Sequence, residues 1–341
     1  MDGKMKAALL YGPYDLRVGD VEKPTIGEDK VLVRIDACGI CPSDIRAYAG
    51  MRKVASFPYV PGHEWVGHIV EVGRNVQGFQ EGDRVVPDWR AVCGKCYYCR
   101  RGIFNYCGNL ARDAVRGGFC EFGYAIDQNL RFIPDNVSYI EACFTEPLAC
   151  CINGIKRCNI KVGDDVVIVG SGPIGLIHLQ LAKHLGARVI SCDIIEERLE
   201  KARSLGADET INPSEEDPIE RAKELTEGRG ANAVIVAVGG KKPIEQGIGM
   251  AGILGVVNLF AGTYPQTKID LDPNVVHYKQ LSITGSHDYT PHDFTVAIKL
   301  IANGTVKVKP LVSHVLPLQK VKEGFDIVVG QKGLKVVIEM A

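Results

Sequence analysis

The sequence predicts an α/β protein of two domains, one rich in β-strands and the other a doubly wound parallel sheet. Two different patterns of apolar residues along the 341 residues indicate this. Up to about residue 150, short β segments alternate with Gly and Pro, as in a barrel or sandwich. From Val166 onward, continuous apolar strands alternate with amphipathic helices, which is typical of a parallel sheet with crossover helices. The length also favours two domains over a single core.

The expected elements follow this division along the chain. In the first domain we expect strands at 5–11, 30–38, 67–73, 82–87 and 121–126. In the second we expect strands at 165–170, 188–193, 209–211, 233–239, 252–260 and 280–285, with helices at 174–186, 197–207 and 214–228. The tail from about His287 returns to helix and strand segments that can rejoin the first domain. The predicted domains are therefore 1–150 with 287–341, and 151–286.

Composition excludes several classes of function. The net charge is −1 and the charges are interspersed, so no basic patch for nucleic acid is expected. No apolar run has the length needed to span a bilayer. The first residues, MDGKMKAALLYGPYD, lack the apolar core and cleavage site of a secretory signal. We therefore expect a cytoplasmic protein with neither a nucleic-acid nor a membrane partner.

A glycine-rich turn follows the strand at 165–170. It reads Gly170-x-Gly172-x-x-Gly175 at the head of a helix, and Asp193 ends the next strand about twenty residues on. Gly170 permits the turn, Gly172 lets the backbone approach a pyrophosphate, and Gly175 lets helix and strand pack closely. Asp193 would bind the ribose hydroxyls and repel a 2′-phosphate, which favours NAD over NADP. The expected cofactor-binding residues are Gly170, Gly172, Pro173, Ile174, Gly175, Asp193 and Arg198. The alternative is a doubly wound domain without a nucleotide.

A set of possible metal ligands lies in the first domain. Cys41, His63 and Glu64 together suit a zinc ion that keeps one position open for chemistry, although each has an ordinary structural reading by itself. Asp44 could orient the imidazole of His63 by a hydrogen bond, without contacting the metal itself. Glu146 is a carboxylate in an apolar stretch, so a metal ion or a metal-bound water is the partner we expect for it.

Four cysteines crowd into the segment CGKCYYCRRGIFNYC at 93–107. Disulfides would need an oxidising compartment. An iron–sulfur cluster is possible, but the spacing is not that of ferredoxins. Four thiolates around one ion describe a structural zinc that fixes a lobe at about 90–110. Six other cysteines, and Cys38, are expected to be small buried side chains; the six are Cys120, Cys143, Cys150, Cys151, Cys158 and Cys192.

The segment GHEWVGHIVEVGRNV resembles the signature of the zinc-containing alcohol dehydrogenases of the medium-chain dehydrogenase/reductase family. The four-cysteine lobe and VGSGPIG are also similar to motifs of that family. The resemblance spans essentially the whole chain and implies a GroES-like catalytic domain interrupted by a Rossmann domain. It implies a catalytic zinc on Cys41, His63 and Glu64, and a structural zinc on Cys93, Cys96, Cys99 and Cys107. It also implies a zinc contact of Glu146, direct or through water, and a proton relay that begins at Ser43.

The expected reaction is hydride transfer between NAD and a secondary alcohol, with a polyol or sugar as the closest substrate class. Many family members have a histidine where this chain has Arg46, and we interpret Arg46 as a clamp on the cofactor's pyrophosphate. Many polyol dehydrogenases have an arginine near Asp288, so sorbitol itself is less favoured. Candidates for the substrate cleft are Tyr48, Phe57, Asn274, His277, His287, Asp288 and Tyr289, for which a packing or surface role is the alternative.

Other interpretations of the sequence remain open. Within the same class, the chain could be an L-threonine 3-dehydrogenase or a sugar 1-dehydrogenase. From a different class, it could bind NAD and zinc without catalysis, although such a protein would be expected to lack part of the Cys41, His63 and Glu64 set. We also expect a homodimer or homotetramer, with the apolar strand GILGVVNLF near the sheet edge as the segment that pairs with another subunit.

Overall fold

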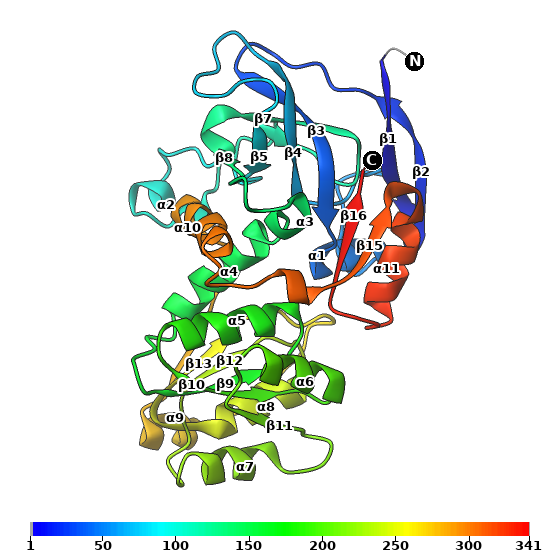
Figure 1. The fold of residues 1–341 in the computed structure, drawn as a ribbon. Coiled ribbons are helices and arrows are strands. Elements are labelled where there is room, and N and C mark those ends of the chain that lie inside the picture. Colours follow the sequence, from blue (N-terminus) through cyan, green and yellow to red (C-terminus); the bar gives the residue numbers. More distant parts are fainter. Residues whose placement is uncertain (1–2, 341) are drawn as a thin grey trace. The chain divides into compact units, whose positions relative to one another are not determined.

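The computed structural model describes residues 3–340, and these form two compact units (Figure 1). Unit 1 comprises Met1–Pro147, Thr290–Gly304 and Val308–Ala341, and unit 2 comprises Leu148–Tyr289 and Thr305–Lys307. The expected boundaries at 150 and 287 differ from these by three residues, and Thr305–Lys307, which the sequence assigned to the first domain, belong to unit 2. The β-rich domain and the α/β domain expected from the sequence are thus confirmed.

Unit 1 contains an eight-stranded sheet and a separate hairpin. The main path of the sheet runs β15-β16-β3-β4-β5-β8, and β7 pairs with both β3 and β6. The hairpin is made of β1 and β2. The strands are β1 (Lys4–Gly12), β2 (Asp15–Glu22), β3 (Lys30–Gly39), β4 (Glu64–Val72), β5 (Arg84–Pro87), β6 (Val115–Arg116), β7 (Phe122–Ile126), β8 (Leu130–Phe132), β15 (Val312–Pro317) and β16 (Lys335–Glu339). All five strands predicted for the first domain are present.

Short helices connect the strands of unit 1. They are α1 (Pro42–Tyr48), α2 (Tyr97–Arg100), α3 (Tyr139–Ala142), α10 (Pro291–Ala302) and α11 (Val321–Val329), with 3-10 turns η1 (Phe104–Tyr106), η2 (Asp127–Asn129), η3 (Lys309–Leu311) and η4 (Leu318–Lys320). A further helix, α4 (Thr145–Lys156), begins in unit 1 and continues into unit 2. The core of unit 1 is apolar and includes Trp65, Phe119 and Phe325.

The C-terminal strand matters most for the site described below. β16 pairs antiparallel with β3, and β3 pairs antiparallel with β4. In this register Gly39 at the end of β3 lies opposite Val337 of β16 on one side and Glu64 of β4 on the other. Residues far apart in the sequence are therefore neighbours across three strands.

Unit 2 is a six-stranded parallel sheet in the order β11-β10-β9-β12-β13-β14. In chain order this is 3-2-1-4-5-6, the arrangement of dinucleotide-binding folds. All five residues of the central strand β9 are buried, which explains its uninterrupted apolar run. The strands are β9 (Asp165–Val169), β10 (Arg188–Cys192), β11 (Glu209–Ile211), β12 (Ala231–Val236), β13 (Ala251–Leu259) and β14 (Ser282–Gly285). The helices are α5 (Pro173–His184), α6 (Glu196–Ser204), α7 (Pro218–Leu225), α8 (Lys241–Met250) and α9 (Pro273–Lys279).

The strand expected near the sheet edge does lie next to the edge strand, but the expectation that it pairs with another subunit is wrong. The segment GILGVVNLF forms β13, which has β12 on one side and β14 on the other. Its ladder is therefore occupied on both sides, and the edge beyond it belongs to β14. The hydrophobic run that suggested an edge reflects instead a strand paired with two neighbours.

The search for membrane-spanning helices covered the described residues. Among them, no helix combines the length and apolar character needed to cross a bilayer.

Candidate active site

Cys41, His63 and Glu64 come together in unit 1. One ligand atom from each lies within 4.8 Å of the other two. Cys41 is the N-cap of α1, His63 directly precedes β4, and Glu64 is the first residue of β4. A thiolate, an imidazole and a carboxylate at this spacing fit a tetrahedral zinc ion with one position left for a substrate or water.

Asp44 lies behind this group and is buried, with 1% of its surface exposed. Its carboxylate accepts backbone N–H groups of Cys41 and Gly62, each at 3.1 Å. It also lies 3.6 Å from Nδ1 of His63. Burial by itself raises the pKa of Asp44, but His63 and the two backbone donors lower it below its ordinary value. The carboxylate therefore stays ionised and is placed to fix the ring of His63, as expected of a residue behind a metal ligand.

His63 is affected in the opposite sense. Burial lowers the pKa of His63, but Asp44 and Cys41 outweigh burial and raise the pKa well above its ordinary value. Without a metal the imidazole is protonated at neutral pH. A zinc ion must displace this proton to bind, so metal binding at the group should release protons.

Glu64 has a partner that the sequence did not suggest. Its carboxylate is bound by the ammonium group of Lys335 from β16. The pair joins residues 271 positions apart, so no local pattern could have shown it. The one available signal was a lysine directly before the apolar run Val336 to Ile338.

Three other predicted residues lie on nearby elements of unit 1. Glu146 is buried in the first turn of α4, and it falls outside the group of mutually close ligand atoms formed by Cys41, His63 and Glu64. Ser43 and Arg46 are half-buried residues of α1, the helix that Cys41 caps. The structure thus gives their places, and their roles remain predictions.

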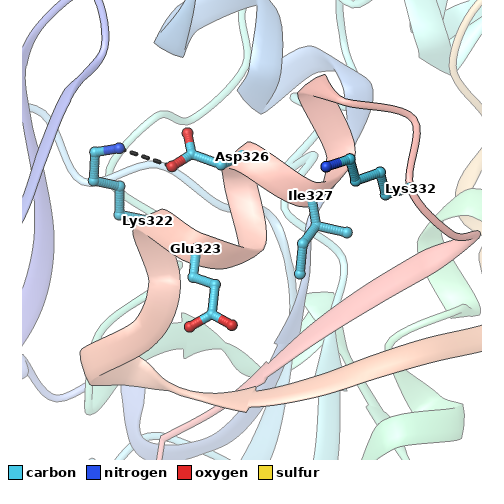
Figure 2. Close-up of a pocket in the computed structure, with 5 residues that line it drawn as sticks. All are labelled: Lys322, Glu323, Asp326, Ile327 and Lys332. Carbon is cyan, nitrogen blue, oxygen red and sulfur yellow. Dashed lines mark hydrogen bonds and ion pairs between the residues drawn. The ribbon is translucent and has the colours of Figure 1, made fainter.

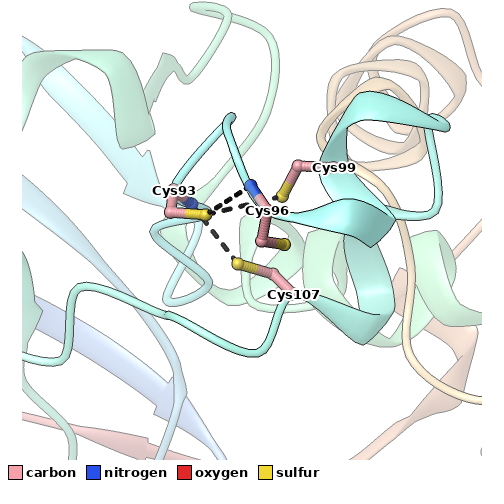
Figure 3. A group of neighbouring side chains, drawn as sticks. All are labelled: Cys93, Cys96, Cys99 and Cys107. Atoms are coloured by element: carbon pink, nitrogen blue, oxygen red, sulfur yellow. Dashed lines mark hydrogen bonds between the residues drawn. The ribbon is translucent and has the colours of Figure 1, made fainter.

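The four cysteines of the lobe gather around a common centre (Figure 3). The sulfurs of Cys93 and Cys99 are 4.0 Å apart. This is about twice the length of a disulfide bond and is close to the roughly 3.8 Å between sulfurs of a tetrahedral zinc site with bonds of about 2.3 Å. All four thiols are free. The lobe therefore has the geometry of a closed metal site with no position left for chemistry.

Backbone donors prepare two of these thiols for a metal. The N–H of Cys99 makes the largest contribution to lowering the pKa of Cys96, to about 6. The N–H of Lys95 makes the largest contribution to lowering the pKa of Cys93. Burial instead raises the pKa of Cys99 to about 12, because its sulfur is in the interior of the lobe. Since the thiolate is the form that binds a metal, Cys93 and Cys96 are the members that ionise most readily.

In unit 2 the glycine-rich turn has the conformation that its sequence predicts. Gly170 follows β9 with φ +94°, a region that favours glycine. Gly172 is the N-cap of α5, and Pro173 and Ile174 begin the helix. A Cβ at Gly175 would lie 1.8 Å from the carbonyl oxygen of Gly170, so only glycine fits there. The backbone N–H groups at the start of α5 are thus presented as a site for an anion.

Asp193 follows β10 and is buried, with 8% of its surface exposed. Its carboxylate accepts the N–H of Ser171 at 2.7 Å and the N–H of Ile195 at 3.0 Å. Arg198 lies 3.9 Å from the same carboxylate. Each carboxylate oxygen has a second lone pair, so Asp193 can still accept hydrogen bonds from a ribose. The contact with Ser171 ties Asp193 directly to the glycine-rich turn.

Two of the candidates for the substrate cleft are core residues. Tyr48 has 1% of its surface exposed, packs edge-on against Tyr14 and Phe325, and donates its hydroxyl to Asp326 at 3.0 Å. Tyr289 also has 1% exposed. Packing therefore accounts for Tyr48, and Tyr289 is a buried residue of the core. The remaining candidates are Phe57, Asn274, His277, His287 and Asp288, and each keeps an exposed or half-buried position.

A shallow hollow of about 420 Å³ lies along α11 (Figure 2). Its lining is mostly charged, and Lys322 forms an ion pair with Asp326 at 2.8 Å. Asp326 is the residue that accepts the hydroxyl of Tyr48, so this carboxylate anchors a core side chain. None of the predicted ligands lines the hollow.

Two family models match the chain. One is described as an alcohol dehydrogenase GroES-like domain and matches residues 27–135, and the other is described as a zinc-binding dehydrogenase and matches residues 173–303. Together they cover more than half of the sequence.

Curated relatives are similar to the chain over nearly its whole length. D-arabitol-phosphate dehydrogenase of Enterococcus avium is 33% identical over 99% of this chain and 98% of its own. Sorbitol dehydrogenase of Halalkalibacterium halodurans is 34% identical over 98% of this chain and 99% of its own. L-threonine 3-dehydrogenase of Pyrococcus abyssi is 34% identical over 99% of both chains.

Solved structures share the fold. A protein of Sinorhizobium meliloti 1021, described as a zinc-binding dehydrogenase and bound to NADP, has a TM-score of 0.92 and 30% identity, covering 99% of this chain and 100% of its own. An alcohol dehydrogenase from Escherichia coli CFT073 in complex with NADH has a TM-score of 0.89 and 29% identity, with the same coverage.

Proposed function

The chain belongs to the zinc-binding alcohol dehydrogenase family, and on that premise we propose that it transfers a hydride between NAD and a secondary alcohol of the polyol or sugar class. The resemblance seen in the sequence is confirmed, and with it an NAD(P)-dependent alcohol dehydrogenase that uses zinc. The observation that carries the proposal is the group formed by Cys41, His63 and Glu64, whose ligand atoms lie within 4.8 Å of one another.

In the proposed mechanism Cys41, His63 and Glu64 hold the catalytic zinc. A zinc ion bound there supplies a Lewis acid that polarises the substrate oxygen. Asp44 keeps the ring of His63 in its binding orientation through the contact at Nδ1. Ser43, on the same helix as Asp44, is the residue that takes the proton from the alcohol and passes it outward. In this proposal Glu146 would contact the zinc, either directly or through a water molecule.

The cofactor is held by residues of unit 2. The turn of Gly170, Gly172 and Gly175 receives the pyrophosphate at the N-terminus of α5, and Asp193 binds the ribose of the adenosine. Because Asp193 is a carboxylate that already accepts two backbone N–H groups, a 2′-phosphate beside it would be repelled. This supports NAD in preference to NADP, with Arg198 and Arg46 as further cofactor contacts.

Cys93, Cys96, Cys99 and Cys107 hold a second zinc in this proposal. Its role is structural, because four thiolates fill the coordination of the ion. The sulfur spacing in the lobe supports this assignment, as does the readiness of Cys93 and Cys96 to ionise.

The substrate class rests on the relatives. Two of those described above are named for a sugar-alcohol phosphate and a sugar alcohol, and both match the chain over at least 98% of its length. L-threonine is the second candidate, since a relative named for it is equally similar. The test is NADH formation from a panel of polyols, polyol phosphates, sugars and L-threonine. Turnover of a polyol or sugar supports the proposal, and turnover of L-threonine alone would replace it.

We also propose a homodimer or homotetramer in which β14 provides the pairing edge. In the described part of unit 2, β14 pairs with β13 and forms one edge of the sheet. An edge strand presents backbone groups that a second copy can pair with. Light scattering on a sizing column tests this, and a monomer at micromolar concentration would exclude it.

A further inference from the structure

A buried lysine lies beneath the proposed metal group. Lys335 is the first residue of β16, and only 6% of its side chain is exposed. Its ammonium group donates to the carbonyl oxygen of Ile40 at 3.1 Å and binds Oε2 of Glu64, whose side chain is 1% exposed. The ring of Phe144 lies 5.8 Å from the same nitrogen. Lysines are almost never buried unless they are paired. The burial of Lys335 therefore depends on its two oxygen partners.

The sheet leaves a space for this pair. A Cβ at Gly39 would lie 2.2 Å from Oε2 of Glu64 and 2.8 Å from Cε of Lys335. Gly39 has an ordinary strand conformation, so a glycine is not required here for a turn. The absence of a side chain instead leaves space for Glu64 and Lys335. β3 thus contributes a gap where β4 and β16 place the two charged groups.

Lys335 also interacts with other acidic groups of the proposed metal site. Burial lowers the pKa of Lys335, but Glu64, Cys41 and Glu146 together raise it above its ordinary value. When ionised, these three groups carry three negative charges. A zinc ion supplies two positive charges, and Lys335 supplies the third. Asp44, whose carboxylate is also ionised, adds a fourth negative charge, so the lysine lowers the net charge of the zinc-loaded site to −1.

We propose that Lys335 is a positioning residue of the zinc site, which holds Glu64 in the pocket and shares this carboxylate with the metal. The inference rests on the zinc site of the proposed function and deepens it. In the metal-free protein, Lys335 is the partner that keeps the buried carboxylate from being uncompensated. When zinc binds, it must share the carboxylate of Glu64 with Lys335. The positive charge of the lysine repels the metal ion. Lys335 thus stabilises the metal-free protein and weakens the binding of zinc.

This arrangement predicts a specific coupling between the lysine and zinc. In Lys335→Met, Glu64 of the metal-free protein loses its counter-ion, and the Tm should fall by an amount on the order of 10 °C. In the zinc-loaded variant the metal compensates Glu64, so the fall in Tm should be less than half as large. By linkage, zinc should be held about tenfold more tightly by Lys335→Met than by the wild type. Lys335→Arg keeps the charge and should restore most of the wild-type behaviour.

The experiment measures Tm and zinc affinity of the full chain without any substrate. Dialysis against a chelator gives samples with the open site emptied, and metal analysis verifies that the lobe zinc is retained. Zinc affinity is then measured by competition with a chromogenic chelator. Ile338→Val, a buried change on the same strand, is the matched control and should lower the Tm equally with and without zinc. Equal losses for Lys335→Met in the two metal states, or weaker zinc binding, would overturn the proposal.

His63→Ala separates this inference from the proposed function. It should remove the zinc-dependent rise in Tm that the wild type shows. If the wild type shows no such rise, the zinc site and the inference both fail. If the rise is present and is equal in Lys335→Met, only the role of Lys335 fails.

Discussion

Lowering the pH should destabilise unit 2 through a single histidine, His178 in α5. Its side chain is fully buried, and its ring packs edge-on against Phe260 with the ring centroids 4.6 Å apart. Neither ring nitrogen has a hydrogen-bond partner among residues 3–340. Burial lowers the pKa of His178 from 6.5 to about 3. The folded chain therefore keeps this ring neutral at pH values where the unfolded chain protonates it.

The sign and size of the effect follow from this difference. Because the folded-state pKa is the lower one, the linked stability is fully present above pH 6.5 and is lost as the pH falls toward about 3. The difference between 6.5 and about 3 corresponds to at most roughly 5 kcal/mol, at about 1.4 kcal/mol for each pKa unit. Between pH 6.5 and about 5 the loss should be about 2 kcal/mol.

His178→Leu removes this titration and also removes two unpaired polar atoms from the core. It should stabilise the protein at neutral pH by about 1–3 kcal/mol, and this advantage should grow by about 2 kcal/mol at pH of about 5. Urea unfolding gives the free energies, and hydrogen exchange of α5 peptides reports on unit 2 separately. His184→Leu, an exposed change on the same helix, is the control and should not alter the pH dependence. A His178→Leu advantage that is the same at both pH values would refute the reasoning.

Changes at three further residues test the sites. Cys99→Ser should remove one zinc per chain and lower the Tm, because the lobe loses the metal that folds it; metal analysis showing no loss of zinc would contradict a zinc ion held by Cys99. Asp193→Ala should erode the preference for NAD, and steady-state kinetics in which the wild type uses NADP as well as NAD would refute the preference itself. Arg46→Ala should raise the KM for NAD more than it lowers kcat, and Arg46→His should add an ionisation to the pH–rate profile; unchanged cofactor binding in Arg46→Ala would make Arg46 a surface residue.

Local patterns were enough to predict most of the fold. The central strand β9 of unit 2 is buried along its whole length and carries an uninterrupted apolar run, and the turn at Gly170 to Gly175 is dictated by contacts within a few residues. The sequence could also group the four lobe cysteines, since Cys93 to Cys107 are close along the chain. Such features depend on short-range geometry, which spacing reveals directly.

Features that depend on strand register were not predictable. The pair of Glu64 and Lys335 exists because β16 lies beside β3, and the space at Gly39 has meaning only once both neighbours are known. The place of GILGVVNLF was misjudged for a similar reason, because a hydrophobic run does not say whether another strand lies beyond it. Tyr48 looked like a candidate for the cleft, but its hydroxyl finds a partner in Asp326 from the far end of the chain.

The central claim is that the group of Cys41, His63 and Glu64 carries a zinc ion on which turnover depends. The most direct measurement compares zinc content, NAD binding and NADH formation in the wild type and His63→Ala. The account predicts two zinc ions per chain in an active wild type, and one in a folded variant that binds NAD but shows no turnover. Full turnover by His63→Ala, or an active wild type with one zinc or none, would contradict it.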